Sequence, residues 1–181
     1  MPEFSNPNVF TNDSTATSGS VTVGDTTWSW SGGTICAPED FADVYPISNT
    51  IVYNTTVSTG ESSVHNRGNC YFINSVLDKC VVEPATADNS HGIFGSCHFV
   101  NSTVSDCSGK NMRGIIYGSV TVVNSVFTGN YSGDHGIIHK KSGTSKISGS
   151  TFSYNYGTNN GILSSQGSKG SMGVRFRNSR G

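Results

Sequence analysis

Apolar and polar positions alternate in a pattern that returns every twenty-odd residues between about residues 50 and 165. Each copy is anchored on a residue, usually asparagine, that precedes a serine or threonine. Apolar side chains stand two positions before the anchor and three positions after it. The anchors are Asn54, Asn74, Asn101, Asn124 and Gly149, at intervals of 20, 27, 23 and 25 residues. Repeats of 20 to 50 residues are typical of solenoids.

Within each copy the local period is that of a β-strand. Segments 97–99 and 120–122 place apolar side chains two residues apart, the spacing of one face of a strand. No stretch keeps the i, i+3, i+4, i+7 spacing of a helix, and glycine recurs too often for helices. We therefore predict an all-β fold, a single-stranded right-handed parallel β-helix of about five to six coils of 20–27 residues.

The repeats occupy only part of the chain. We predict a flexible N-terminal segment (1–18), an irregular first coil and cap (19–46), the repeat body (47–165) and a basic flexible tail (166–181). Trp28 and Trp30 stand two residues apart, so we expect both on one side of a strand. There they either plug the open first coil, which a solenoid has to cap, or stack on sugar rings.

Aligned residues of successive coils lie above one another in such a fold, about 4.8 Å apart. Each column of the alignment is therefore a physical ladder. We expect phenylalanines to stack inside the tube and turn asparagines to hydrogen-bond from coil to coil. The expected structural ladders are formed by Asn74, Asn101, Asn124, Asn130, Asn155, Phe127 and Phe152.

Four of the five cysteines fall into two aligned pairs. Cys70 aligns with Cys97 in a strand, and we expect this pair to be small core residues. Cys80 and Cys107 replace the turn asparagine, where α-carbons about 4.8 Å apart lie within the disulfide range of about 4.4–6.8 Å. The spacing is compatible with a disulfide between Cys80 and Cys107 but does not require one. Cys36 has no aligned cysteine.

Two short motifs carry a resemblance to a known family. Segments 127–130 (FTGN) and 152–155 (FSYN) read Phe-x-x-Asn, and His135-Gly136-Ile137-Ile138 is a degraded Gly-Gly-Ala-Ile. Across about residues 50–165 the repeats resemble those of chlamydial-type polymorphic outer membrane proteins and similar β-helix adhesins. The resemblance implies a β-helix with an adhesive surface. Pectin-degrading enzymes use the same coil, so the fold alone does not decide the function.

Composition and charge limit the classes of partner that this chain is expected to bind. Serine, threonine, asparagine and glycine make up 86 of 181 residues, and charged residues only 13%, which suits a β-structure with many turns. Of the 12 acidic residues only Asp134 follows residue 106, whereas most bases do, so the basic end suits an anionic surface or polysaccharide. No apolar run approaches the ~18 residues of a membrane span. We expect no cofactor and no nucleic-acid partner.

A column of polar residues before the recurring Gly-Ile pair is the one candidate for catalysis. If the chain is an enzyme, a polysaccharide lyase or glycoside hydrolase, its site would use His91, Arg113, Asp134 and His135. Acid–base cleavage of sugars usually needs two carboxylates, and Asp134 alone is present in this half of the chain. The enzymatic hypothesis therefore ranks second.

A third hypothesis rests on the column two residues after the anchor: Thr56, Val76, Thr103, Val126 and Thr151. These side chains are β-branched and of similar size, and we expect them to face outward. A flat, threonine-rich strand face resembles the surface of ice-binding proteins, although strong β-propensity accounts for the residues equally well. The candidate ligand-facing residues are Thr56, Thr103, Thr151, Trp28 and Trp30.

The function favoured by the sequence is that of a cell-surface or secreted structural and adhesive β-helix module. We expect it to be a processed or truncated fragment of a longer repeat protein, located outside the cell. Its expected partners are glycans or cell-surface proteins. The unpaired strand edges of an open solenoid also favour end-to-end self-association.

Overall fold

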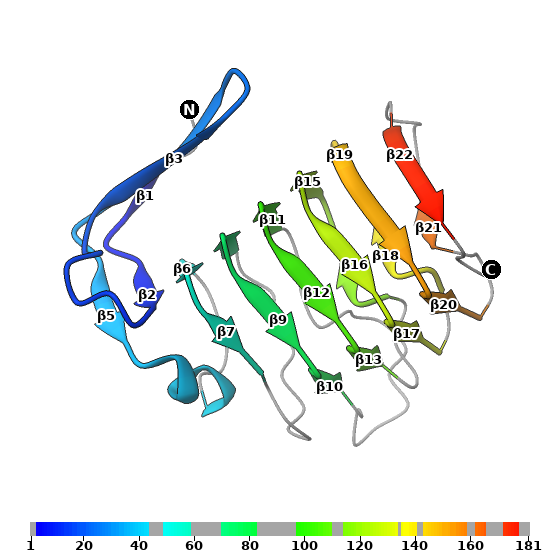
Figure 1. Ribbon diagram of the computed structural model, residues 1–181, viewed down its shortest axis with the longest axis horizontal. Coiled ribbons are helices and arrows are strands. Elements are labelled where there is room, and N and C mark those ends of the chain that lie inside the picture. Colours follow the sequence, from blue (N-terminus) through cyan, green and yellow to red (C-terminus); the bar gives the residue numbers. More distant parts are fainter. Residues whose placement is uncertain are drawn as a thin grey trace.

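The computed structural model is a β-solenoid of about five turns, built almost entirely from stacked parallel strands (Figure 1). The structure describes residues 3–43, 49–58, 70–82, 97–109, 114–133, 135–140, 143–158, 162–165 and 172–177. The predicted all-β parallel helix is confirmed.

Each turn contributes two consecutive strands to the largest sheet. The first strands are β6 (Thr50–Tyr53), β8 (Cys70–Ile73), β11 (Cys97–Val100) and β15 (Val120–Val123). The second strands are β7 (Thr56–Val57), β9 (Val76–Asp78), β12 (Thr103–Ser105) and β16 (Val126–Thr128). In the next turn β19 (Lys146–Ser153) passes through both positions.

The repeat anchor is the bend between these two strands. Asn54, Asn74, Asn101 and Asn124 have φ angles of 49–50°, and Gly149 has φ 60°. This left-handed region is open to glycine, and asparagine enters it more readily than most residues. The anchor is therefore asparagine or glycine because the backbone turns there.

The rest of each turn forms two smaller sheets. One contains β10 (Val81–Val82), β13 (Ser108–Gly109), β17 (Tyr131–Ser132) and β20 (Tyr156–Gly157). The other contains β14 (Ile116–Tyr117), β18 (Ile138–Lys140) and β21 (Leu163–Ser165). Strand β22 (Met172–Arg177) pairs in parallel with β19.

The strand register follows the repeat alignment residue by residue. Val76 pairs with Thr103, Thr103 with Val126, and Val126 with Thr151. Inside the tube, Phe72 stacks on Phe99 with ring centroids 4.7 Å apart. One strand further along each turn, Phe127 stacks on Phe152 at 4.9 Å, and both rings are fully buried.

Buried polar side chains line the bends and connect the turns. From Asn74 onward, the serine after each anchor accepts a hydrogen bond from the backbone N–H of the residue after the preceding anchor; Ser125 Oγ, for example, accepts from the N–H of Ser102 (3.0 Å). Its hydroxyl donates to the carbonyl two residues before it, as Ser102 does to Val100 (2.9 Å). These bonds satisfy backbone groups that would otherwise be buried without partners.

The N-terminal segment contains paired strands, where the sequence predicted a flexible stretch. Strands β1 (Glu3–Ser5) and β2 (Asn8–Phe10) lie within it, and β2 pairs with both β6 and β5 (Thr34–Cys36). Val9 and Phe10 hold β2 in place because both are fully buried, on opposite faces of the strand. The 3-10 helix η1 (Pro38–Asp43) places Phe41 against Phe10 in the core.

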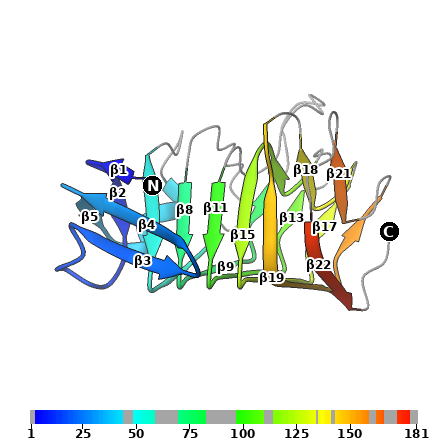
Figure 2. The same cartoon turned by 90° about the horizontal axis from the view of Figure 1, so that it is seen from above.

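A β-hairpin covers the outer face of the first-strand column. Strands β3 (Gly19–Val23) and β4 (Thr26–Ser31) are antiparallel and run across the solenoid strands near its N-terminal end (Figure 2). Trp28 and Trp30 from β4 are only 1% and 2% exposed. They pack with Ile51, Tyr71 and other outward residues of the solenoid strands.

This arrangement corrects the expectations for the two tryptophans. Trp28 Nε1 donates a hydrogen bond to His98 Nδ1 (3.2 Å), and Trp30 Nε1 donates to the carbonyl of Ala16 (2.9 Å). Both indoles cover the side of the solenoid and do not plug its open first coil. Because both rings are buried, neither offers an exposed face for stacking on a sugar ring.

Candidate functional site: the outer strand face and its tyrosines

The second strands of the turns present a flat outer face. Along each strand the residues that point inward, such as Val104 and Phe127, are fully buried, so their neighbours point outward. The outward column next to the anchors is unbroken over five turns, and all its members are exposed or half-buried. It consists of Thr56, Val76, Thr103, Val126 and Thr151.

A second outward column, two residues further along, carries mostly hydroxyl groups. It consists of Asp78, Ser105, Thr128 and Ser153. The hydroxyl of Ser105 donates to Asp78 Oδ1 (2.8 Å), and that of Ser153 donates to Thr128 Oγ1 (3.1 Å). These bonds hold the side chains against the sheet. From Asp78 to Ser153 the column carries one charge, that of Asp78, which pairs with Lys79 (3.4 Å), and Arg177 of β22 follows in register with Ser153.

A ladder of two exposed tyrosines, Tyr131 and Tyr156, adjoins this face across the next corner of the turn (β17 and β20 in Figure 1). Their rings are nearly parallel, with centroids 5.6 Å apart and an interplanar angle of 5°. They are 39% and 44% exposed, and Tyr154 at the corner is 68% exposed. With Val126, these are the large hydrophobic residues that are exposed in the described parts of the chain. All four belong to the two adjacent turns that follow the anchors Asn124 and Gly149.

Buried asparagines fix the backbone directly before each tyrosine. The backbone N–H and the side-chain amide of Asn130 both donate to Asn155 Oδ1, at 3.0 and 2.8 Å. The amide of Asn155 in turn donates to the carbonyl of Phe127 (2.8 Å). Both asparagines are 1% exposed. The tyrosine ladder is therefore mounted on a rigid corner, which lowers the entropic cost of binding a ligand.

The residues proposed for catalysis are only partly placed. His91, Arg113 and Asp134 lie outside the described residues. His135 is half-buried, and its ring centroid is 4.6 Å from that of His139. His139, which is 2% exposed, stacks on Tyr117 at 5.2 Å. Within the described ranges no three His, Cys, Asp or Glu residues cluster in a way that could hold a metal ion.

An open groove of about 340 Å³ lies between the tip of the β3–β4 hairpin and strands β15 and β19. Asp25 and Lys146 contribute its charged groups, and Trp28 and Val123 contribute its apolar lining. The lining holds one carboxylate and therefore lacks the carboxylate pair typical of glycoside hydrolases.

The sequence analysis did not single out the tyrosine ladder. The signal was nevertheless present, because Tyr131 and Tyr156 both stand seven positions after their anchors, Asn124 and Gly149. The earlier copies carry other residues there, Val81 and Ser108. Because this column is aromatic in only two turns, the alignment does not distinguish it from a column of variable surface residues.

In the described part of the chain, no helix has the length and apolar character needed to cross a bilayer. A scan against protein-family models and searches of curated proteins and of solved structures found no match for this chain.

Proposed function

We propose that this chain is a cell-surface or secreted structural and adhesive module, which binds its partner through the outer strand face. The observation that carries the proposal is the exposed ladder of Tyr131 and Tyr156 beside columns of short hydroxyl side chains. The likeness of its Phe-x-x-Asn repeats to those of polymorphic outer membrane adhesins supports the same role.

The chemistry of the face favours a neutral glycan as the partner. A tyrosine ring offers an apolar surface for the C–H face of a sugar ring, and its hydroxyl group offers a hydrogen bond at the edge. Ser105, Thr128 and Ser153 supply further hydroxyl groups close by. Charged side chains, which would select an ionic ligand, are absent from the central positions of these columns; Asp78 precedes them, and Arg175 and Arg177 of β22 follow in register.

A glycan array tests the proposal with the wild-type chain and the Tyr131→Ala/Tyr156→Ala variant. We expect the wild type to bind neutral oligosaccharides and the variant to lose that signal. Thr22→Ala/Thr27→Ala, which alters a hydrogen-bonded pair on the distant hairpin, is the matched control and should bind like the wild type. Equal binding by all three proteins would remove the ladder from the site.

One observation favours a second function, binding to ice. The Thr/Val column is unbroken from Thr56 to Thr151, and neighbouring strands of a sheet are about 4.8 Å apart. Such a regular, flat array of methyl and hydroxyl groups suits an ordered layer of water.

Inhibition of ice recrystallisation separates this function from glycan binding. If the column binds ice, Thr103→Lys in its centre abolishes the inhibition, whereas Tyr131→Ala/Tyr156→Ala leaves it intact. Absence of any inhibition by the wild-type chain would rule out the ice-binding function.

A further inference from the structure

Cys80 and Cys107 occupy the same position on two adjacent turns. The strand pairs on either side of them, Asp78 with Ser105 and Val81 with Ser108, are in register. The backbone N–H of Ser108 also donates directly to the carbonyl of Cys80 (2.9 Å). In-register neighbours lie about 4.8 Å apart, which is within the α-carbon separation of about 4.4–6.8 Å that a disulfide needs.

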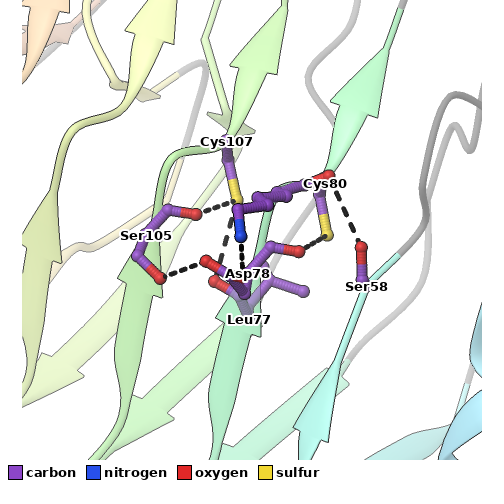
Figure 3. A network of polar contacts seen from close by, with 7 residues as sticks. Ser58, Leu77, Asp78, Cys80, Ser105 and Cys107 are labelled. Carbon is purple, nitrogen blue, oxygen red and sulfur yellow. Dashed lines mark hydrogen bonds and ion pairs between the residues drawn. The ribbon is translucent and has the colours of Figure 1, made fainter.

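The thiol of Cys107 reaches the turn that carries Cys80, because it lies 3.8 Å from the carbonyl oxygen of Leu77. Both cysteines are fully buried. Each thiol faces the carbonyl two residues before it, Cys80 that of Asp78 (3.8 Å) and Cys107 that of Ser105 (3.3 Å), as Figure 3 shows. A hydrogen bond with the Cys80 side chain, together with burial, raises the pKa of the Cys107 thiol well above its ordinary value.

This pair replaces a structural link that the later turns make in another way. Asn130 and Asn155 follow in the same column and join their turns by side-chain hydrogen bonds. Cys107 still donates its backbone N–H to Asn130 Oδ1 (3.0 Å), but its own side chain carries no amide. The ladder of asparagine side chains therefore ends at Asn130. In the two preceding turns the same position holds the thiols of Cys107 and Cys80.

We propose that Cys80 and Cys107 are a disulfide site that covalently joins two adjacent turns of the solenoid. The oxidant is a small-molecule disulfide such as oxidised glutathione. The thiolate of one cysteine attacks it, forms a mixed disulfide and releases one glutathione thiolate. The thiolate of the second cysteine then attacks the protein sulfur of the mixed disulfide and releases the second. Two protein thiols are oxidised, and one glutathione disulfide is reduced to two thiols.

The burial of the pair determines when the bond forms. Exchange requires a thiolate with access to its oxidant, and the folded turn provides neither. The bond therefore forms while the chain folds, before the turn closes over the sulfurs. Once folded, both the dithiol and the disulfide forms exchange slowly.

The experiment is to refold the whole chain in a glutathione redox buffer and, separately, in excess dithiothreitol. Peptide mapping under non-reducing conditions should find a Cys80–Cys107 cross-link only in the first sample. Because the bond closes a loop of 28 residues (80 to 107), the melting temperature of the oxidised sample should be about 5–15 °C higher.

Cys80→Asn/Cys107→Asn is the matched variant, because it extends the asparagine ladder by two turns and keeps the fold testable. Its melting temperature should be the same in both buffers, whereas Cys36→Ser should retain the wild-type difference. Two results would overturn the proposal. One is a map in which Cys80 and Cys107 stay unlinked after oxidative refolding. The other is a cross-link between Cys70 and Cys97, which are also in register, in place of Cys80–Cys107.

Discussion

At the scale of single residues, each position of the repeat meets one structural requirement of the turn. Asparagine or glycine at the anchor accepts a positive φ. The next residue, as at Ser102, satisfies buried backbone groups of two turns at once. Residues three positions after the anchor fill the tube. Side chains at the remaining strand positions point outward, and most of them vary from turn to turn.

Phe127 is the residue whose removal should harm the core most clearly. Its ring is fully buried between Phe99 (5.3 Å) and Phe152 (4.9 Å). Phe127→Ala should lower the free energy of unfolding by about 3–5 kcal/mol, because it leaves a cavity in a closely packed column. Urea denaturation followed by circular dichroism measures the change.

The control for this variant is Tyr154→Ala, which removes a ring that is 68% exposed. It should change the free energy of unfolding by less than about 0.5 kcal/mol, as is usual for surface positions. Equal losses in the two variants would show that the Phe127 column is not the core of the tube.

At the scale of elements, the β3–β4 hairpin explains an outward column that looks irregular in the sequence. Tyr71 and His98 point away from the tube, but Tyr71 is only 3% exposed because β1 and β4 cover it. The repeat could not predict this cover, since the hairpin has no second copy in the chain. Its packing depends on contacts between residues about 20 to 70 positions apart, such as Trp30 with Tyr53 and Trp28 with His98.

The hairpin should loosen as the solution becomes acidic. Burial lowers the pKa of His98 below its ordinary value near 6.5. The unfolded chain therefore takes up a proton at a higher pH than the folded chain does. Stability from neutral His98 is complete above about pH 6.5 and is lost as the pH falls through the lower, folded-state pKa. Protonation also removes the Nδ1 acceptor of the Trp28 hydrogen bond.

Tryptophan fluorescence reports this change directly, because both tryptophans of the chain lie in β4. We expect the emission to shift to longer wavelength as the pH falls through the lowered pKa of His98, whereas in His98→Gln, which keeps an acceptor without titrating, it should stay constant. The same shift in both proteins would assign the pH dependence to another group.

At the scale of the whole molecule, the repeat predicts most of the architecture and little of the binding surface. Alignment on the anchors places Cys70 beside Cys97 and Val126 beside Thr151, and the strands pair in that register. This succeeds because the residues around each anchor keep the same spacing from turn to turn, although the turns differ in length from 20 to 27 residues. The tyrosine ladder follows from the same register, but no structural requirement places tyrosine there, so its role had to be recognised from exposure.

The whole molecule thus carries an aromatic and hydroxyl-rich face whose central columns, from Ser105 to Ser153, are uncharged. A ligand held by ring stacking and neutral hydrogen bonds should bind almost equally well at low and high salt, because salt screens only charge interactions. Each stacked ring contributes about 0.5–1.5 kcal/mol, so removal of both tyrosines should weaken binding by about 5- to 150-fold.

Isothermal titration with a panel of soluble neutral oligosaccharides, at low and at high salt, tests this account most directly. We predict that the wild-type chain binds at least one of them with an affinity independent of salt. Tyr131→Ala/Tyr156→Ala should weaken that binding by about 5- to 150-fold while keeping the wild-type melting temperature. Binding that disappears at high salt, that is unchanged in the variant, or that is absent from the wild-type chain would contradict the proposed role of this face.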